Sequence, residues 1–362
     1  MKIQDIKMGK INTALKHPYR VGKKVLTFSD EIIIKIITDT GEIGYGSAAP
    51  TPLITGETEN SIVGAINHVK HEIVGLDIDN LEEIMKIIHN SIFGNNSAKA
   101  AIDMAIYDLF CKKYGLPLYK FLGGYKTTLT TDITIANDTV EHMVQKSLEA
   151  VMEGYTYLKV KIGNDVDLDI ERVKSVRKAV RRGIKIRVDA NQGWAPKEAV
   201  SIIRKFEDMG LDIEFVEQPV KAWDIDGLKY VTDNVSTKIL ADEAVFGPSD
   251  AFKIIEKRAA DLINIKLMKC GGINNAIKIY NMAENMGIRC MMGCMLESRI
   301  GITAAASFAA SKSNMIKADL DTMLLFEHES IIGGACIIGN KITVNDFAGL
   351  GISDVIGWHE IL

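Results

Sequence analysis

Three stretches decide the fold of this chain: IRVDAN (186–191), EFVEQP (214–219) and ILADEA (239–244). Each is a short apolar run of β-type residues that ends in an acid, and the acids are 28 and 25 residues apart, the length of a strand–helix–strand unit. The acids are Asp189, Glu217 and Asp242. Successive parallel strands end at one edge of a sheet, so three carboxylates there predict a site for a hard divalent cation. The alternative is that these are unrelated acids at strand ends. All three occupy the same position after a buried apolar run, which argues against that alternative.

The same pattern repeats from residue 126 onward. Eight apolar runs start near residues 131, 157, 185, 213, 238, 262, 289 and 315, at intervals of 24–28 residues. Nearly continuous apolar strands that alternate with helices predict a parallel sheet covered by those helices. Eight such units predict a (β/α)8 barrel of the TIM type, with its active site at the C-terminal ends of the strands.

The flanking sequence predicts a second, smaller unit. Residues 1–125 have the pattern of an α+β domain, and the barrel is expected over 126–325. The tail, 326–362, has short β-type runs with Gly and Asn turns and is expected to pack back on the first domain. Helices of that first domain are predicted at 57–75, 81–93 and 97–115.

Composition narrows the class of protein. A net charge of −4 gives no basic surface for nucleic acid, and no apolar run approaches the roughly 20 residues that cross a bilayer. The N-terminal residues alternate polar and apolar and have no signal-peptide pattern. Five cysteines without a C-x-x-C pair favour a reducing compartment. We therefore expect a cytoplasmic enzyme with neither nucleic-acid nor membrane partners.

Lysines accompany the acids on the predicted strands. Lys159 and Lys161 are two residues apart in LKVKIG, so period-two alternation puts both on the barrel interior. Lys266 ends the sixth apolar run, INIKLM, and the second and sixth strands of an eight-stranded barrel face each other. An amine therefore lies on each side of the acids. The alternative for the first pair is a strand-end pair neutralised by acids.

This arrangement suits proton transfer at the carbon next to a carboxylate. A divalent cation on that carboxylate acidifies the α-proton, because the developing negative charge lies against the cation. One lysine removes the proton, and the lysine on the other face returns it and inverts the carbon. We expect Lys159 and Lys161 to lower each other's pKa, and we expect the lysine that removes the proton to have a pKa tuned towards about 7–8.

A pair of acids ends the eighth run. Asp319 and Asp321 in KADLD suit a cationic part of a substrate, such as an ammonium; a helix N-cap or a surface acid pair is the alternative. The seven histidines fall outside the strand ends, so a histidine base is not expected.

Taken together, LKVKIG, RVDANQGW, VEQP, LADEA and INIKLMKCGG resemble the enolase superfamily, and within it the muconate lactonizing enzyme subgroup. A base on the sixth strand, rather than a histidine on the seventh, separates the chain from the mandelate racemase branch. The resemblance covers essentially the whole chain, including an N-terminal capping domain. The DLD of the eighth strand and GCMLES of the seventh are similar to the dipeptide epimerases, notably the L-Ala-D/L-Glu epimerases.

This resemblance implies a Mg²⁺-dependent 1,1-proton transfer at the α-carbon of the C-terminal residue of a dipeptide, with Mn²⁺ as the alternative metal. It also implies peptidoglycan peptide metabolism and allows a homo-oligomer. Metal ligands would be Asp189, Glu217 and Asp242. The two bases would be Lys161 and Lys266, with Lys159 stabilising the enediolate, and Asp319 and Asp321 would hold the substrate ammonium.

The resemblance further implies pocket-lining roles for Thr134, Met295 and Glu297. Lys24 aligns with an arginine that contacts the glutamate side chain in the Ala-Glu enzymes. A lysine at this position keeps the positive charge, but it cannot form the two parallel hydrogen bonds that an arginine makes with a carboxylate. A loop around Ile54 and Thr55 is expected to close over the substrate.

Other functions share this scaffold. An o-succinylbenzoate synthase, a muconate cycloisomerase-type lyase and an N-acylamino acid racemase are disfavoured, because their substrates have no ammonium for Asp319 and Asp321. A non-catalytic, metal-dependent binding module would not need two opposed lysines.

Overall fold

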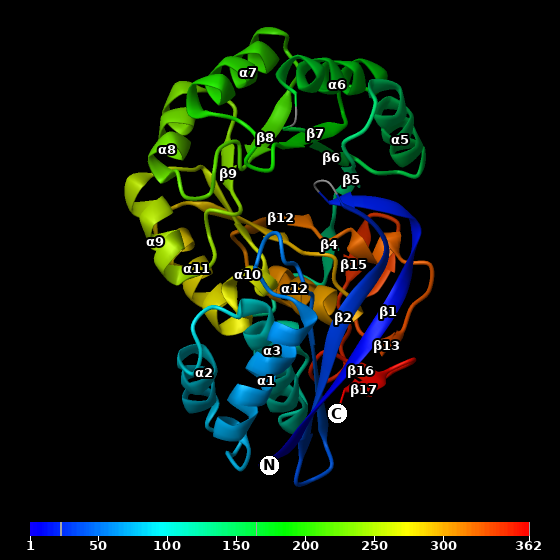
Figure 1. Cartoon of the computed structure of the whole chain (residues 1–362), viewed down its shortest axis with the longest axis vertical. Coiled ribbons are helices and arrows are strands. Elements are labelled where there is room, and N and C mark those ends of the chain that lie inside the picture. The colour runs from blue at the N-terminus through cyan, green and yellow to red at the C-terminus, as the bar shows by residue number, and fades with distance from the viewer. Residues whose placement is uncertain (22–23, 164, 362) are drawn as a thin grey trace.

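The computed structural model describes residues 1–21, 24–163 and 165–361, and for residues 18–21 and 24 it describes the backbone alone. Figure 1 shows two parts along the long axis, with the barrel at one end and an α+β part at the other. Both chain ends lie in the α+β part. None of the helices in the described ranges has the length and apolarity to cross a membrane.

The α+β part is built on an antiparallel sheet in the order β17-β1-β2-β3. Its strands are β1 (Ile3–Val21), β2 (Lys24–Thr38), β3 (Ile43–Ala48) and β17 (His359–Ile361). The helices are α1 (Glu59–Ile73), α2 (Leu81–Asn90), α3 (Asn96–Lys113) and the short α4 (Leu118–Phe121). The ribbon of β1 and β2 extends from this part to the barrel, near β5 (Figure 1).

Helix α3 is buried on nearly every side because it lies between this sheet and the barrel. Glycines let β3 approach it closely: a Cβ on Gly46 would lie 1.9 Å from the carbonyl oxygen of Ala101, and one on Gly44 would lie 2.3 Å from that of Ala105. Small residues at the contact therefore bring α3 against the strand.

The barrel has eight parallel strands, ordered β5 to β12 around the sheet. The strands are β5 (Ile133–Ile135), β6 (Tyr157–Lys161), β7 (Lys185–Asp189), β8 (Ile213–Glu217), β9 (Ile239–Ala241), β10 (Leu262–Ile265), β11 (Arg289–Gly293) and β12 (Met315–Asp319). A parallel bridge between Thr131 and Ala318 joins the first and last strands. The predicted modified (β/α)8 barrel with an N-terminal α+β domain is confirmed.

Helices surround the strands (Figure 1). They are α5 (Val140–Met152), α6 (Val166–Ala179), α7 (Pro196–Asp208), α8 (Ile225–Asn234), α9 (Pro248–Lys257), α11 (Ile273–Asn285) and α12 (Arg299–Ser311), with the short α10 (Leu267–Cys270) directly after β10. The barrel interior opposite the active site is filled by an apolar cluster of Phe215, Leu240, Leu262 and Met291. Next to it Arg187 pairs with Asp132 at 2.5 Å and with Glu214 at 2.8 Å.

The C-terminal tail contacts both parts. Strand β17 pairs with β1, while β15 pairs with β4, the strand that leads into the barrel. The remaining short elements are β4 (Thr128–Thr130), the 3-10 helix η1 (Thr322–Leu325), β13 (Ile331–Gly333), β14 (Cys336–Ile338), β15 (Lys341–Thr343) and β16 (Ile352–Val355). We propose domain boundaries near residues 125 and 326.

The fully buried Asp108 of α3 joins the tail to the α+β sheet. Its carboxylate accepts hydrogen bonds from the amides of Tyr45 (3.0 Å) and Leu350 (2.7 Å), and it pairs with Lys112 at 2.9 Å. Replacing Asp108 with Ala should lower the unfolding free energy by about 3–5 kcal/mol, because buried donors lose their acceptor.

Urea denaturation measures this change, with Asp233→Ala as the control. Asp233 pairs with Lys229 on the surface of α8, and its loss should cost less than about 1 kcal/mol. Equal, small losses in both variants would contradict the role of Asp108.

Candidate active site

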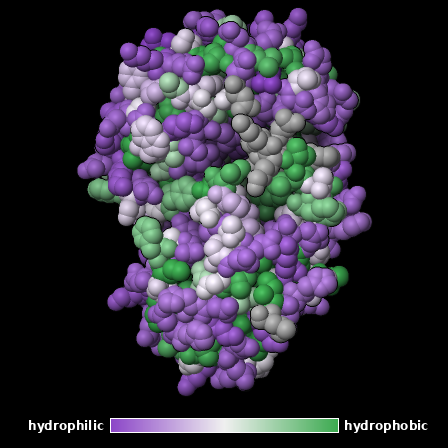
Figure 2. All heavy atoms as spheres, in the orientation of Figure 1, coloured by the Kyte–Doolittle hydropathy of each residue, from purple (hydrophilic) through white to green (hydrophobic). Residues whose placement is uncertain are grey.

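A cavity of about 610 Å³ lies at the C-terminal ends of the barrel strands. The strand ends form its floor, and β2 together with residues 50–54 of the α+β part forms a wall. Figure 2 shows a hollow on this face, between the barrel and the α+β part. The two parts therefore enclose one site.

The three predicted metal ligands are buried at the ends of neighbouring strands: Asp242 lines the cavity, while Asp189 and Glu217 contact Lys159, which lines it. Asp189 ends β7 and is paired in register with Glu217 at the end of β8, while Asp242 follows β9. Their placement follows from the pattern that predicted it: each acid comes at or directly after the carboxyl end of a mostly buried strand.

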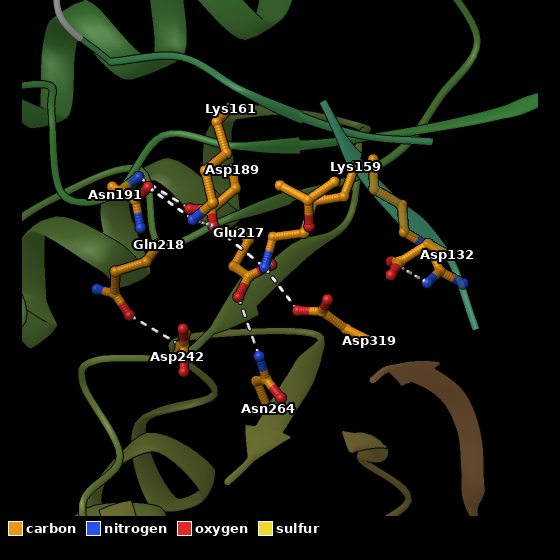
Figure 3. A network of polar contacts seen from close by, with 12 residues as sticks. Asp132, Lys159, Lys161, Asp189, Asn191, Glu217, Gln218, Asp242, Asn264 and Asp319 are labelled. Atoms are coloured by element: carbon orange, nitrogen blue, oxygen red, sulfur yellow. Dashed lines mark hydrogen bonds and ion pairs between the residues drawn. The ribbon is translucent and has the colours of Figure 1, made fainter. Parts of the chain in front are cut away.

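An ammonium lies among the acids. Lys159 Nζ is 3.1 Å from Asp189, 2.9 Å from Glu217 and 2.7 Å from Asp319. Figure 3 shows this lysine reaching between side chains from different strands. Although burial opposes its charge, the surrounding carboxylates raise the pKa of Lys159 well above its usual value.

The two predicted bases come from opposite walls. Lys161 Nζ, at the end of β6, is 3.0 Å from Asp189 and 3.1 Å from Asn191. Lys266 Nζ, after β10, is 2.8 Å from Asp242. Strands β6 and β10 are four apart in an eight-stranded barrel, and both lysines line the cavity.

The expected lowering of the lysine pKa is wrong for Lys159 and Lys266. Burial does lower the pKa of Lys266, but the neighbouring Asp242 outweighs it, and the pKa lies above its usual value. Repulsion between lysines on one strand is thus smaller than the attraction from acids on the strands around it.

The acids respond differently to this shared burial. Burial raises the pKa of Asp189, but Lys161 and Lys159 outweigh it and hold that pKa at about 2. Lysines likewise hold the pKa of Asp242 below its usual range. Burial, aided by Asp189 and Asp242, raises the pKa of Glu217 well above normal. Three acids this close repel one another.

The donor set fits a divalent metal ion. All three ligands are hard carboxylates, and their buried oxygens are neutralised by ammonium groups, Glu217 Oε2 by Lys159 at 2.9 Å and Asp242 Oδ1 by Lys269 at 2.5 Å, so the site is one that demands positive charge. In the described part of the chain, no group of three or more His, Cys, Asp or Glu side chains is placed to hold a metal ion, and lysines contact these oxygens. The types of side chain in the site, rather than their present arrangement, support the binding of a divalent metal ion.

The acid pair of the eighth strand faces the same cavity. Asp319 contacts Lys159, and Asp321 Oδ2 accepts a hydrogen bond from the amide of Thr134 at 2.7 Å. Thr134 also lines the cavity, and so do both acids. Burial and Asp319 raise the pKa of Asp321 to about 6.

The loop after β11 has Met295 at the cavity and Glu297 behind it. Met295 lines the cavity. Glu297 is buried behind that wall, where its Oε1 accepts from the amide of Met295 at 2.7 Å. The pocket-lining role predicted for Glu297 is therefore corrected: its side chain supports Met295, because the chain turns as β11 ends at Gly293.

Of the remaining predicted residues, Ile54 is the one that the structure places at the cavity. Ile54 lines the cavity, and a turn holds its loop, with the amide of Thr55 donating to the carbonyl of Thr51 at 2.9 Å. The backbone of Lys24 begins β2, and its side chain lies outside the described residues.

The sequence analysis missed several side chains that contact the predicted site residues. Asn264 donates to Glu217 at 2.9 Å, and Gln218 accepts from the amide of Asp242 at 2.9 Å (Figure 3). Asn191 contacts Lys161, and Lys269 forms an ion pair with Asp242. Asn264 is two residues before Lys266, so strand alternation could have revealed it; the other three follow strand ends, where alternation no longer applies.

Comparison with known proteins gives two family matches. Residues 142–353 match the model described as enolase C-terminal domain-like, and residues 4–123 match the mandelate racemase / muconate lactonizing enzyme N-terminal domain. An L-Ala-D/L-Glu epimerase from Clostridium acetobutylicum is 49% identical over 98% of this chain and 99% of its own length. A hydrophobic dipeptide epimerase from Enterococcus faecalis is 43% identical over 98% of this chain and 100% of its own.

Solved structures give the same result. The substrate-liganded L-Ala-D/L-Glu epimerase from Bacillus subtilis superposes with a TM-score of 0.96 at 45% identity, covering 98% of this chain and 99% of the other. The Enterococcus faecalis dipeptide epimerase complexed with Mg and L-Leu-L-Tyr has a TM-score of 0.94 at 43% identity, covering 98% and 100%.

The raised pKa of Asp321 predicts a pH-dependent affinity for a ligand ammonium. Only the ionised carboxylate attracts the ammonium, so affinity should fall as the pH drops through about 6. Between pH 7 and pH 5 the KM of an ammonium-bearing ligand should rise about tenfold. In Asp321→Asn this part of the pH dependence should be missing, and an unchanged profile in that variant would assign it to another group.

Proposed function

The chain belongs to the mandelate racemase / muconate lactonizing enzyme family of the enolase superfamily, and from that premise we propose that it is a dipeptide epimerase. Its reaction is a 1,1-proton transfer at the α-carbon of the C-terminal residue, with Ala-Glu as the preferred dipeptide. The observation that carries this proposal is the pair Lys161 and Lys266, which face one cavity from opposite barrel walls.

Each lysine reaches one face of a planar intermediate. One neutral amine takes the α-proton, and the electron pair of the broken C–H bond moves towards the substrate carboxylate. The opposite lysine, as an ammonium, donates a proton to the other face, and a new C–H bond of inverted configuration forms. By the family resemblance, Lys161 serves the L residue and Lys266 the D residue, while Lys159 stabilises the negative charge.

The proposed metal is Mg²⁺, which the titles of related dipeptide epimerase structures name. Asp189, Glu217 and Asp242 would hold it. When bound, the cation would stabilise negative charge on the substrate carboxylate and would offset the acids that now raise the pKa of Lys159 and Lys266.

Two acids of the cavity would bind the N-terminal ammonium of the dipeptide. Asp319 and Asp321 are both buried at the cavity, and an ammonium there would reduce the repulsion between them. The lyases of this family that act on substrates without an ammonium gain nothing from such a pair. This favours a dipeptide with a free N-terminus.

A second candidate is an epimerase of hydrophobic dipeptides. The relative from Enterococcus faecalis has that name, and the cavity rim includes the apolar side chains of Leu26, Phe28, Leu53, Ile54 and Leu296. The two candidates share their chemistry and differ in the residue that meets the substrate side chain. Lys24 is our proposal for that residue in the Ala-Glu case.

Hydrogen exchange in D₂O tests the two-base reaction. In Lys266→Ala epimerisation should stop, because no base returns a proton to the far face, while Lys161 should still exchange the α-proton of one stereoisomer without inversion. Lys161→Ala should exchange the opposite stereoisomer. The measurement is deuterium uptake into L-Ala-L-Glu and L-Ala-D-Glu by mass spectrometry; exchange of both isomers by either variant would overturn the opposed-base assignment.

Substrate preference tests Lys24. Lys24→Met should lower kcat/KM for Ala-Glu by about ten- to a hundredfold, the value of a charge-assisted contact of about 1.5–3 kcal/mol. For Ala-Leu the loss in kcat/KM should stay below about threefold, because the leucine side chain has no charge for Lys24 to contact. Lys23→Met is the matched control and should leave the preference unchanged. Equal losses for both dipeptides would mean that another residue, such as Arg20 or Lys23, contacts the side chain.

A further inference from the structure

Lys269 is a charged side chain in the barrel that the proposed reaction does not use. It lies on α10, three residues after the base Lys266, and only 1% of it is exposed. Fully buried lysines are rare in proteins unless their charge is paired. Its position next to a proposed metal ligand gives it a partner and suggests a role.

The ammonium of Lys269 contacts both the side-chain carboxylate and the main-chain carbonyl of Asp242. It forms an ion pair with Oδ1 at 2.5 Å and donates a hydrogen bond to the main-chain carbonyl of the same residue. A third acceptor, the carbonyl of Asn264, lies at 3.3 Å. One side chain thus fixes the carboxylate relative to its own backbone.

The two oxygens of Asp242 are thereby distinguished. Oδ2 is 2.8 Å from Lys266, which lines the cavity, and Oδ1 is held by Lys269, which is buried away from it. Asn264, whose carbonyl Lys269 approaches, donates its side-chain amide to Glu217 at 2.9 Å. Lys269 therefore contacts one proposed ligand directly and is linked to a second through Asn264.

We propose that Lys269 is a positioning residue for the metal: it fixes the rotation of the Asp242 carboxylate so that Oδ2 is presented to the cavity. This inference rests on the proposed role of Asp242 as a metal ligand. Charged groups behind a ligand that fix its orientation are typically worth 10- to 100-fold in metal affinity.

The α+β part holds the turn that carries Lys269. Asn96, at the start of α3, donates its side-chain amide to the carbonyl of Lys269 at 2.5 Å and lies 3.4 Å from that of Phe246. The next two amides of α3 donate to Glu57, which ends the loop beside the cavity. The position of Lys269 is thus set from outside the barrel.

Titration of the substrate-free protein with Mg²⁺ by isothermal calorimetry tests the inference without any turnover. Lys269→Met keeps the length of the side chain and removes its charge, and it should weaken Mg²⁺ binding about 10- to 100-fold. Lys99→Met is the matched control. Lys99 is also a buried lysine, but it donates to the carbonyls of His89 and Ile92 in the α+β part, so its loss should leave Mg²⁺ affinity within about twofold while lowering stability.

A second variant decides the matter if Lys269→Met does not fold. Asn96→Ala leaves the ammonium in place and releases the turn, and it should weaken Mg²⁺ binding severalfold. Folded variants that bind Mg²⁺ as the wild type does would overturn the positioning role and leave the proposed function standing. Tighter binding in Lys269→Met would overturn it as well, because it would show that the ammonium merely competes with the metal. A wild-type protein that binds no Mg²⁺ would overturn the metal site and this inference together.

Discussion

The ammonium of Lys159 contacts three buried carboxylates from three strands, and the rest of the site depends on that contact. Moving a charge from water into a protein interior costs several kcal/mol, and acids placed side by side repel one another in addition. Asp189 and Glu217 can end adjacent buried strands only because cations lie between and beside them. The barrel provides those cations from β6 and from the end of β10, so closure of the sheet is a condition for the chemistry.

The same balance explains why acids of one cluster differ in their pKa. Asp189 has two lysines at its carboxylate and a pKa of about 2, whereas the pKa of Glu217, with Lys159 as its main cationic neighbour, is raised. Asp321, next to Asp319 and held by a neutral amide, has a pKa of about 6. Burial is common to all three, so the balance of neighbouring ammonium groups and neighbouring acids decides the outcome.

Much of this site could be predicted because strands obey a simple rule. Alternation with period two, together with the repeat length, put Lys159, Lys161 and the three acids at one edge of a parallel sheet. Period-two alternation gives no information about residues beyond the end of a strand. Glu297 follows the end of β11, and its side chain turns back to the amide of Met295, which no periodicity indicates. Lys269 lies in a short helical turn after β10, and only the folded chain shows that it reaches Asp242.

The pKa of the lysines illustrates a second limit. Sequence spacing shows the charges on one strand, and on that basis Lys159 and Lys161 should depress each other. The folded barrel adds the charges of the neighbouring strands, which are acids, and reverses the sign for Lys159. Electrostatics in this closed barrel is set by neighbours across the sheet, which are 24 or more residues away in sequence.

The α+β part contributes more than a cover. Glu57 accepts the amides of Ser97 and Ala98 at the start of α3, and Asn96 at the same helix end contacts the carbonyl of Lys269. The loop that lines the cavity and the turn behind Asp242 are thus fixed to one helix terminus. Because α3 is packed between the sheet and the barrel, a shift of the loop without a shift of this terminus would break buried hydrogen bonds. The substrate side and the proposed metal side of the cavity are therefore held by a common rigid element, so that the second domain contributes to both sides of the cavity.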